Sequence, residues 1–502
     1  MFSAATLTEV RICIRADVSP QVGTGHIMRC LALALAAKER AISVQFIARL
    51  GVPWVREQLA REDIMLAEVS GDVPAWEQPE VLLAQLANAG EPHATQEWVV
   101  LDGYHFGLDC QQAVRAAGYK LLVIDDYAHL PEYSCDILLN QNIGAKELVY
   151  KGDIGQKLLG PQYVLLRPDF FAARKSAEKR RIPPKAQNIL LTLGGGDFSA
   201  HLPRMVPDFT LPELAGCILR VIAGAVPPEH IRALLRNCPA DVKILNRVED
   251  MPALLLDTDL CITAGGSTCW ELCCLGVPFL ALEVAENQRY AVRELSRRNV
   301  ASLFTAENMK TMLRSVSARK RTQQAGFDLV KGTGTLSCLF HLCGPVFFLR
   351  AAEEADSEFI WRLASEPEVR AASGNSEPIA WKHHQDWFQS RLRDTMPFFV
   401  PCDHEAKPMG YVRFTESGTG MATVSIAVSQ ELRGKGLGGP LLKAACRKFW
   451  QYFPQYRLDA VVLLKNTASL KIFLAADFET KGTIVIDNRE FMCFSVPARG
   501  GI

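Results

Sequence analysis

The sequence lacks an excess of charge of either sign, because its 502 residues include 55 Lys and Arg against 55 Asp and Glu. A net charge of zero excludes a general electrostatic attraction to nucleic acid or to an anionic membrane, so an anionic ligand requires a local site. Low-complexity segments are also missing, and 49% of the residues are apolar, which excludes a disordered chain. At about 100–200 residues per domain, the length predicts about three domains.

Closely paired cysteines are missing as well. The 15 cysteines are odd in number and scattered between Cys13 and Cys493, and no pair has the two-residue spacing of a CxxC motif. This pattern excludes a small disulfide framework and predicts reduced thiols in the cytoplasm. The closest group, Cys269, Cys273 and Cys274, lies in an apolar stretch without a neighbouring histidine. We therefore expect buried thiols there rather than a metal site.

We find neither a signal peptide nor a membrane span. Met1 to Val10 has no basic start. The longest uncharged run, Gly332 to Leu349, contains glycines and a proline, which predict a short helix followed by a strand. We expect a cytoplasmic, soluble protein with no nucleic-acid partner and no membrane insertion.

Three regions follow from the patterning. In residues 1–165 and again in 186–335, short β-branched runs alternate with helical patterns, which is typical of parallel βαβ units. Two similar α/β domains facing one another across a cleft are the simplest assembly. The basic stretch from Arg174 to Arg181, followed by Pro183 and Pro184, is interpreted as a linker between them. From 346 to 498 the strands look antiparallel, which predicts a third domain of the α+β kind.

The expected elements near candidate sites are short and well bounded. In open α/β sheets, ligands bind at the carboxyl ends of the strands, so those ends matter most. The predicted strands are Val10–Arg15, Trp98–Asp102, Leu121–Asp125, Asn188–Leu193 and Asp259–Thr263, with a helix over Gly25–Lys38.

The run Gly23-Thr24-Gly25-His26 joins the first strand to this helix. Its glycines permit a tight turn and a close approach of substrate to the backbone. His26 lies at the helix start, where the positive end of the dipole disfavours its charged form, so we predict a base near neutral pH. A plain helix start capped by His26 is the alternative that the motif leaves open.

A denser motif opens a helix in the second domain. Free amides and hydroxyls in Gly265-Gly266-Ser267-Thr268 predict a diphosphate site. Glu271 lies one turn further, where it is predicted to accept hydrogen bonds from ribose hydroxyls rather than to be a solvated carboxylate. The predicted contacts to substrate in this domain are Gly194, Gly195, Gly266, Ser267, Thr268 and Glu271.

Residues 1 to about 330 resemble the UDP-2,4-diacetamido-2,4,6-trideoxy-β-L-altropyranose hydrolases of pseudaminic acid biosynthesis, which are related in fold to the GT-B lipid II glycosyltransferase. The motifs that carry the resemblance span both domains. They are Arg15-x-Asp17, Gly23-x-Gly25-His26-x-x-Arg29-Cys30, Asp102-x-Tyr104, Gly194-Gly195, Gly265-Gly266-Ser267-Thr268-x-x-Glu271 and Asn287-Gln288.

The resemblance implies a GT-B-like pair of Rossmann-like domains and hydrolysis at the anomeric carbon with release of UDP. Because UDP is a good leaving group, amides at the Ser267 helix start can stabilise it without a metal. The resemblance further implies His26 as the base that activates water and Asp17 as its orienting partner. Substrate contacts are then expected from Arg15, Tyr104, Asn287 and Gln288.

In the third region, the strand Ala422–Val428 leads into a glycine-rich turn and a helix through Trp450. Free amides at that helix start predict a nest for a pyrophosphate, with a basic surface turn as the alternative. The pattern Arg433-x-x-Gly436-x-Gly438 resembles the acetyl-CoA signature of the GNAT N-acetyltransferases. The expected acetyl-CoA contacts are Val428, Arg433, Gly434, Lys435, Gly436, Leu437, Gly438 and Asn466.

Residues 346–498 further resemble the GNAT subgroup that acetylates the 4-amino group of a UDP-sugar, through Leu349-Arg350-Ala351 with Asp356 and through His384-x-x-Trp387-Phe388. His384 is predicted as a base or substrate contact, with a buried structural histidine as the alternative. Phe473 departs from the family, because many relatives have there a tyrosine that protonates the leaving thiolate, and phenylalanine has no proton to donate.

The sequence therefore predicts a bifunctional enzyme that acetylates a UDP-4-amino-sugar with acetyl-CoA and hydrolyses the resulting UDP-diacetamido-sugar, without a metal. One alternative is a GT-B glycosyltransferase that transfers the sugar from a UDP-sugar donor to an acceptor. Another is a non-catalytic protein that binds a UDP-sugar.

Overall fold

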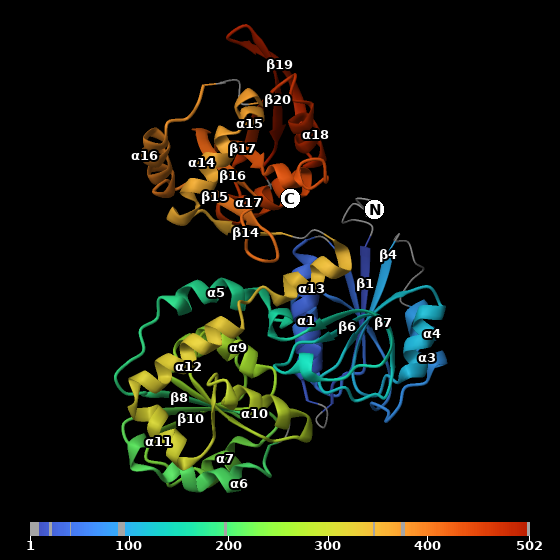
Figure 1. Ribbon diagram of the computed structural model, residues 1–502, viewed down its shortest axis with the longest axis vertical. Helices are drawn as coiled ribbons and strands as arrows, with labels where there is room; N and C mark the ends of the chain where they lie inside the picture. Colours follow the sequence, from blue (N-terminus) through green and yellow to red (C-terminus); the bar gives the residue numbers. More distant parts are fainter. Residues whose placement is uncertain are drawn as a thin grey trace. The chain divides into compact units, whose positions relative to one another are not determined.

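The computed structural model describes residues 10–19, 23–40, 42–88, 96–194, 198–344, 347–372 and 377–498. The described part of the chain divides into two compact units, residues 10–344 and residues 347–498 (Figure 1). The larger unit contains two parallel sheets and the smaller one a mixed sheet. The boundaries predicted for the three domains stay predictions.

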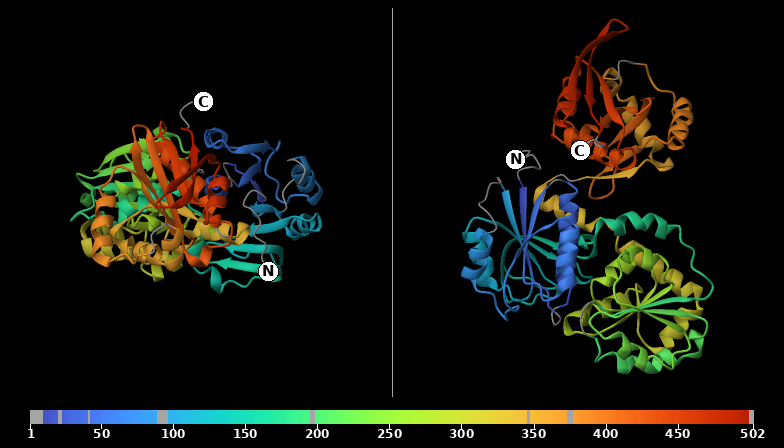
Figure 2. Two further views of the ribbon diagram at one scale, coloured as in Figure 1. Left: turned by 90° about the horizontal axis from the view of Figure 1, so that it is seen from above. Right: turned by 180° about the vertical axis from the view of Figure 1, so that it is seen from behind.

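The first α/β domain is built on a fully parallel sheet of seven strands. Its elements are β1 Val10–Ala16, α1 Gly25–Lys38, β2 Ser43–Ala48, α2 Pro53–Arg61, β3 Met65–Glu68, α3 Pro79–Asn88, β4 Gln96–Asp102, α4 Leu108–Ala116, β5 Lys120–Ile124, β6 Tyr133–Asn140, β7 Gly152–Leu159 and, much later in the chain, α13 Gly334–Cys343. The order β3-β2-β1-β4-β5-β6-β7 reverses direction between β1 and β4, which creates a ligand-binding crevice at their carboxyl ends. Helices α1 and α13 cover one face, and α3 and α4 the other (Figures 1 and 2).

The second α/β domain repeats this plan with six parallel strands. Its elements are α5 Pro168–Glu178, β8 Asn188–Thr192, α6 Leu202–Met205, β9 Ile218–Ile222, α7 Pro228–Leu234, β10 Asp241–Leu245, α8 Met251–Leu256, β11 Leu260–Ala264, α9 Thr268–Cys274, β12 Phe279–Leu282, α10 Arg289–Arg297, β13 Ser302–Leu303, α11 Ala306–Arg314 and α12 Val316–Leu329. The order β10-β9-β8-β11-β12-β13 reverses between β8 and β11. The turn after β11, which contains Ser267, therefore lies at the crevice of this sheet.

Helix α5 corrects one expectation from the sequence. Arg174 was predicted to lie in a linker, but the structure buries it within the second domain. Its guanidinium donates hydrogen bonds to the carbonyls of Cys274 (3.1 Å), Val330 (2.5 Å) and Phe327 (3.1 Å). The guanidinium of Arg174 donates to carbonyls at the ends of α9 and α12, where no helical amide is available as a donor. Arg174 therefore has a structural role.

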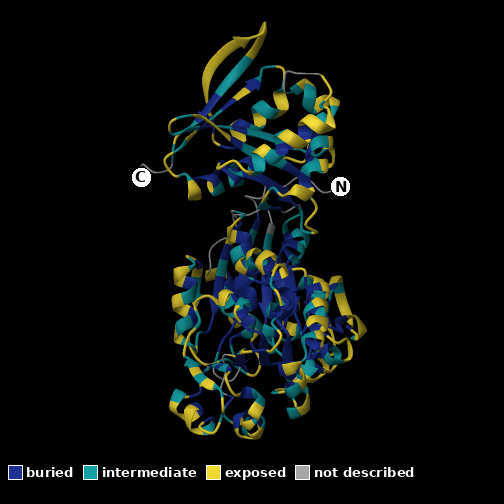
Figure 3. Cartoon of the chain, turned by 90° about the vertical axis from the view of Figure 1, so that its left-hand side faces the viewer, coloured by how far each residue is buried: buried dark blue, intermediate teal, exposed yellow. Residues whose placement is uncertain are grey.

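The smaller unit has the predicted α+β character. Its elements are β14 Phe348–Ala351, α14 Ser357–Ser365, α15 Pro367–Ala372, α16 Trp381–Leu392, β15 Phe398–Cys402, β16 Gly410–Gly418, β17 Met421–Val428, α17 Gly438–Tyr452, β18 Arg457–Leu463, α18 Thr467–Ala475, β19 Glu479–Ile486 and β20 Arg489–Val496. The sheet order is β14-β15-β16-β17-β18-β20-β19, and the pair β17–β18 is parallel while its other pairs are antiparallel. Strand β19 forms the edge and is exposed along its whole length (Figure 3).

Strands β17 and β18 separate along their length. They pair over Met421–Thr423 and Arg457–Asp459, and the ladder ends there. The following part of β17, up to Val428, forms no ladder with β18, so the two strands leave a wedge between them. A wedge in a parallel pair exposes backbone groups of β17 to a ligand, because those groups lack the partners that a continuous ladder provides.

Twelve of the fifteen cysteines are buried, and Cys238, Cys343 and Cys493 are half-buried; all fifteen are free thiols. The expectation of buried thiols is thus largely confirmed, including for Cys269, Cys273 and Cys274. Within the residues that the structure describes, no helix combines the length and the apolar character needed to cross a membrane.

Candidate active sites

His26 lies in a hydrogen-bonded cluster at the crevice of the first sheet. Its Nδ1 is 2.6 Å from a carboxylate oxygen of Asp102, the last residue of β4. Arg29, one turn further along α1, donates to both oxygens of Asp102 from Nε (2.7 Å) and Nη2 (2.6 Å). Burial alone would raise the pKa of Asp102, but Arg29 and His26 hold it well below its usual range. Because an ionised carboxylate only accepts hydrogen bonds, Nδ1 donates this hydrogen bond, and in the neutral ring the lone pair is then on Nε2.

Asp126 and Tyr104 complete this cluster. Arg29 Nη1 donates to Asp126 Oδ1 at 2.7 Å, and the Tyr104 hydroxyl donates to Asp126 Oδ2 at 2.7 Å. The Tyr104 ring lies edge-on against His26, with ring centroids 5.1 Å apart. Burial would raise the pKa of Asp126, yet Arg29 lowers it to about 2. Two carboxylates therefore face one guanidinium in this cluster.

The structure contradicts the predicted role of Asp17. It does not pair with His26; its carboxylate binds Arg15, accepts from the Arg49 amide at 2.7 Å and lies 3.1 Å from His105 Nε2. Asp102 takes the position next to His26 that was assigned to Asp17. The reason is the direction of side chains at the end of β1, which sequence spacing does not reveal.

Arg15 is also not available to a substrate. Its side chain is fully buried and binds Asp17, Glu77 (3.0 Å) and Gln85 (3.0 Å). The prediction that Arg15 contacts substrate is therefore wrong. Together with Arg49, it neutralises two buried carboxylates, which is a structural task.

Asp17, Glu77 and His105 present one ligand atom each within 4.8 Å of one another, the spacing of a metal site. Both carboxylates are, however, already bound by guanidinium groups: Arg49 Nη1 lies 3.1 Å from Asp17 and 2.6 Å from Glu77. The positive charges of Arg15 and Arg49 repel a cation. These residues thus do not fit a metal ion.

The glycine-rich turn of the second domain approaches the His26 cluster. Ser267 Oγ lies 3.9 Å from the position that a Cβ at Gly25 would occupy. The turn Gly265–Thr268 is half-buried, and the hydroxyls of Ser267 and Thr268 form no hydrogen bond with another described residue. The structure therefore brings Gly25, the residue before His26, next to Ser267, which lies 242 positions further along the sequence.

Glu271 follows one turn along α9 from Ser267. Burial raises the pKa of Glu271 to about 7, with Arg167 opposing the shift and Asp169 adding to it. Gln288 lies near the turn and accepts a hydrogen bond from the Val284 amide at 3.3 Å. Gly194 follows β8 with φ +99°. Gly195 and the side chain of Asn287 lie outside the described part of the chain.

The turn before α17 has the backbone that a phosphate nest requires. Gly434 and Gly436 adopt φ +76° and +73°, and nothing lies within 4 Å of a Cβ placed on either. Lys435 is exposed. Arg433 donates to the Val428 carbonyl at 3.1 Å and pairs with Glu366 and with Glu368 (2.7 Å).

The other expected acetyl-CoA contacts have packing or capping roles in this structure. A Cβ on Gly438 would lie 2.5 Å from Ile472 Cδ1, so this glycine permits close packing of α17 on α18. Asn466 caps α18: its Oδ1 accepts from the Ser469 amide at 3.0 Å. Leu437 is buried in a small apolar cluster beneath the turn. Whether these residues also contact acetyl-CoA stays a prediction.

His384 is almost completely buried, with 2% of its surface exposed. Its Nε2 lies 2.8 Å from the Ser357 carbonyl, and its ring is stacked on Trp381 and Phe388. Burial lowers its pKa, although the hydrogen bond to Ser357 opposes this. The geometry corrects the predicted substrate contact and favours the structural histidine. Phe473 is likewise buried, stacked on Phe494.

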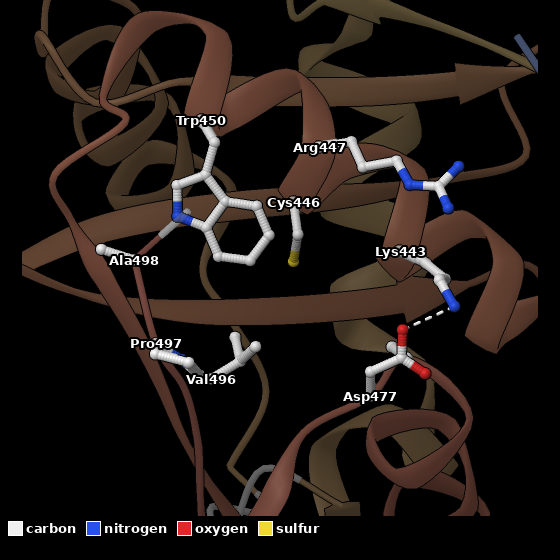
Figure 4. A pocket seen from close by; sticks show the side chains of 9 residues that line it. Lys443, Cys446, Arg447, Trp450, Asp477, Val496, Pro497 and Ala498 are labelled. Carbon is white, nitrogen blue, oxygen red and sulfur yellow. Dashed lines mark ion pairs between the residues drawn. The ribbon is translucent and has the colours of Figure 1, made fainter. Parts of the chain in front are cut away.

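A cavity of about 200 Å³ lies on the α17 side of this unit (Figure 4). Lys443 and Asp477 form an ion pair of 2.5 Å at its wall, and Trp450 and Arg447 line it from α17. Its other walls come from the end of β20.

Three residues of the His26 cluster were not predicted as functional, and one of them, Asp102, stood in the motif Asp102-x-Tyr104 without a role. Arg29 stood within the resemblance motif without a role, and Asp126 directly follows a strand ending in Asp125. Their spacing did contain information: Arg29 is three residues after His26 on α1, and Asp126 follows the end of β5, next to β4. Residues at strand ends of neighbouring strands meet at one sheet edge.

The larger unit has the GT-B-like arrangement of two Rossmann-like domains, and the smaller unit is a GNAT acetyltransferase domain. Residues 347–479 match the acetyltransferase (GNAT) domain family. Over the whole length, the chain is 22% identical to an uncharacterized protein of Methanocaldococcus jannaschii, covering 94% of this chain and 97% of that protein.

Other relatives match parts of the chain. The UDP-2,4-diacetamido-2,4,6-trideoxy-beta-L-altropyranose hydrolase of Campylobacter jejuni is 23% identical, covering 58% of this chain and 97% of the relative. The L-methionine sulfoximine/L-methionine sulfone acetyltransferase of Pseudomonas aeruginosa is 28% identical over 22% of this chain and 65% of its own length. Among solved structures, MurG of Acinetobacter baumannii is 16% identical with a TM-score of 0.47, covering 66% of this chain and 99% of that one.

Proposed function

We propose that the chain is a bifunctional enzyme of pseudaminic acid biosynthesis. Its GNAT domain acetylates the amine of a UDP-4-amino-sugar with acetyl-CoA, and its GT-B-like unit hydrolyses the UDP-2,4-diacetamido-2,4,6-trideoxyhexose to UDP and free sugar. The approach of Ser267 to Gly25, the residue before His26, carries the hydrolase half, because our proposal uses Ser267 to bind the diphosphate and His26 as the base. The similarity to the Campylobacter jejuni hydrolase supports the same half.

In the proposed hydrolysis, His26 Nε2 removes a proton from water while the water oxygen bonds to the anomeric carbon. The bond from that carbon to the UDP oxygen breaks, and its electron pair leaves with UDP. The hydroxyls of Ser267 and Thr268 donate hydrogen bonds to the diphosphate. The proton on His26 then passes to solvent. We expect Tyr104, Gly194, Glu271 and Gln288 to contact the rest of the substrate.

The charges around His26 and around Ser267 agree with these two proposed roles. The carboxylates of Asp102 and Asp126 next to His26 outnumber the single cation of Arg29, which disfavours a diphosphate there. The Ser267 turn offers neutral hydroxyls and glycine amides, and burial raises the pKa of Glu271 to about 7, so this turn opposes a diphosphate with less negative charge than a fully ionised carboxylate would supply.

In the proposed acetyl transfer, the acceptor amine attacks the thioester carbonyl of acetyl-CoA, the carbon–sulfur bond breaks, coenzyme A leaves as a thiolate, and the new amide nitrogen loses a proton to solvent. The nest at Gly434 and Gly436 is placed to hold the pyrophosphate, and the wedge between β17 and β18 to admit the pantetheine arm. Since Phe473 donates no proton, water protonates the thiolate.

The test is mass spectrometry of the chain with UDP-4-amino-sugar epimers, with and without acetyl-CoA. We expect an acetylated intermediate, followed by UDP and free diacetamido-sugar. Release of unacetylated sugar would contradict the coupling. A glycosyltransferase would release little UDP until an acceptor is added, and a binding protein would show saturable binding without turnover.

His26→Ala tests the assignment of the base. We expect turnover of the UDP-diacetamido-sugar to fall about 10²–10⁴-fold with little loss of UDP binding. His201→Ala is the matched control, because His201 lies in the second domain, outside the His26 cluster. Near-normal turnover of His26→Ala would overturn the assignment.

A further inference from the structure

One guanidinium of the acetyltransferase unit has no anionic partner among the described residues. The Nε of Arg413, on β16, is buried without a hydrogen-bond partner, and its guanidinium lies over the Trp387 ring, 5.3 Å from the centroid. Its neighbours differ: Arg350 pairs with Asp356 and Arg433 with Glu366. Arg413 as a whole is half-buried, and burying its Nε without a hydrogen-bond partner is costly, so this arrangement requires an explanation.

The polar side chains of Tyr411, Arg413 and Ser425, together with the aromatic rings of Trp387 and Phe398, form a patch. Tyr411 lies two residues earlier on the same strand, and so on the same face. Ser425 of β17 is the cross-strand partner of Arg413, and Phe398 of β15 is its partner on the other side. Phe398 also contacts the rings of Trp387 and Tyr411.

The patch lies on the sheet face opposite α17. Val412 and Phe414, which alternate with Tyr411 and Arg413, belong to the core beneath α17. Tyr411 and Arg413 therefore face the side of α14 and α16. Both arginines near Tyr411, Arg413 and Arg370, lower its pKa, although burial raises it more strongly. This places two cations beside one phenol.

The patch is also next to the wedge. Ser425 lies in the part of β17 beyond Thr423, where the ladder to β18 has ended. A group bound on Arg413 is thus one strand away from the backbone that the proposed function assigns to the thioester arm. An amine on the same molecule could reach the thioester carbonyl while its anionic group stays on Arg413.

We propose that Arg413, assisted by Tyr411, anchors an anionic group of the acceptor, a phosphate or a carboxylate, so that the acetyltransferase domain acts on amines carried by anionic molecules. This rests on the proposed acetyl transfer and adds the charge class of its acceptor. Stacked on Trp387, the planar guanidinium presents its N–H edge to an oxyanion. A polyamine would be repelled by the same residue.

The experiment compares acceptors with the full chain and with Arg413→Gln. The acceptors are a UDP-linked 4-amino-sugar, L-methionine sulfone and the uncharged methyl glycoside of the 4-amino-sugar; release of coenzyme A is measured. For the anionic acceptor used by the parent chain, we expect KM to rise about 10- to 100-fold, since a charged hydrogen bond is lost. The KM for acetyl-CoA and turnover of the uncharged glycoside should not change.

Arg447→Gln, an exposed arginine on the other side of the sheet, is the matched control and should leave every KM unchanged. Arg413→Lys should recover only part of the affinity, because lysine keeps the charge but not the planar stack on Trp387. The two anionic acceptors separate a phosphate anchor from a carboxylate anchor. An Arg413→Gln chain whose KM stays within about twofold for both would overturn the proposal.

Binding separates this proposal from the proposed function. In calorimetric titration of the chain loaded with coenzyme A, we expect the UDP-linked amino-sugar to occupy two sites, one in each unit, and Arg413→Gln to lose one of them. If no acceptor is acetylated but Arg413→Gln still loses that site, the proposed acetyl transfer fails while the anion anchor stands. If binding is identical in both chains, the anchor fails.

Discussion

At the scale of single residues, the hydrogen bond from His26 to Asp102 determines which ring nitrogen is free. Asp102→Asn keeps the shape but offers an amide, which allows the wrong tautomer of His26. We expect kcat of the hydrolase to fall about 10²–10⁴-fold with little change in KM. Steady-state release of UDP measures this.

The control for this substitution is Asp109→Asn, at an exposed position on α4, which should leave kcat unchanged. Because Arg29 keeps Asp126 as its ion-pair partner in the Asp102→Asn variant, the guanidinium is not left unpaired, and thermal unfolding should confirm a folded protein. A variant with parental kcat would show that Asp102 does not position His26.

Glu271 makes stability depend on pH in a direction unusual for a carboxylate. Its pKa is raised from 4.5 to about 7 by burial, so between these values the folded state holds a proton that the unfolded state has lost. The free energy of unfolding therefore falls as pH rises through this window. Glu271→Gln should raise Tm above pH 7, by about 2–4 °C for each kcal/mol recovered, and leave it unchanged near pH 4.5.

Thermal scans between pH 4.5 and 8 measure this difference, with exposed Glu249→Gln as the control. A Tm difference that is constant across this range would contradict the raised pKa of Glu271.

At the scale of elements, local patterns predicted much of the fold. The helix Gly25–Lys38 is observed with the predicted bounds, and the predicted strand at 188–193 differs from β8 by a single residue. Such patterns follow from hydrophobic periodicity and glycine punctuation, which act over a few residues. The partners of Arg15 and Asp17 could not be predicted, because they come from Arg49 and Glu77 on other segments. Likewise, burial of His384 depends on α14, which supplies the Ser357 carbonyl.

Two glycines near the start of α17 should respond differently to alanine. At Gly436 there is space for a Cβ, but φ +73° disfavours an L-residue by about 1 kcal/mol. We expect Gly436→Ala to weaken acetyl-CoA binding about 5- to 10-fold, since the nest must relax. Isothermal titration measures this.

At Gly439 the backbone is ordinary, but a Cβ would lie 2.7 Å from Ala475 Cβ on α18. Gly439→Ala should therefore destabilise the unit by about 1–3 kcal/mol through overpacking. Its acetyl-CoA affinity should change less than that of Gly436→Ala. The reverse ranking in titration and thermal unfolding would contradict these roles.

At the scale of the whole molecule, the larger unit does not end with α12, the last helix of its second domain. It continues to α13. Helix α13 returns to the first domain, where Thr335 Oγ1 accepts from the Leu166 amide and donates to the Leu166 carbonyl, both at 2.8 Å. A chain ending at Gly344 should therefore fold and release UDP like the full chain. A chain ending at Leu329 loses α13 and should be unstable. Circular dichroism and UDP release compare the two, and equal behaviour would contradict the role of α13.

The close approach of Ser267 to Gly25 links the two α/β domains. A nucleotide bound beside this contact would touch both domains, so its binding free energy would stabilise both against thermal unfolding. Without ligand, differential scanning calorimetry of the larger unit should resolve two overlapping heat-absorption peaks; with UDP, they should merge into one sharper peak. A bulky residue at position 25 would keep the peaks apart even when UDP is present, which makes a single glycine the determinant of cooperative melting.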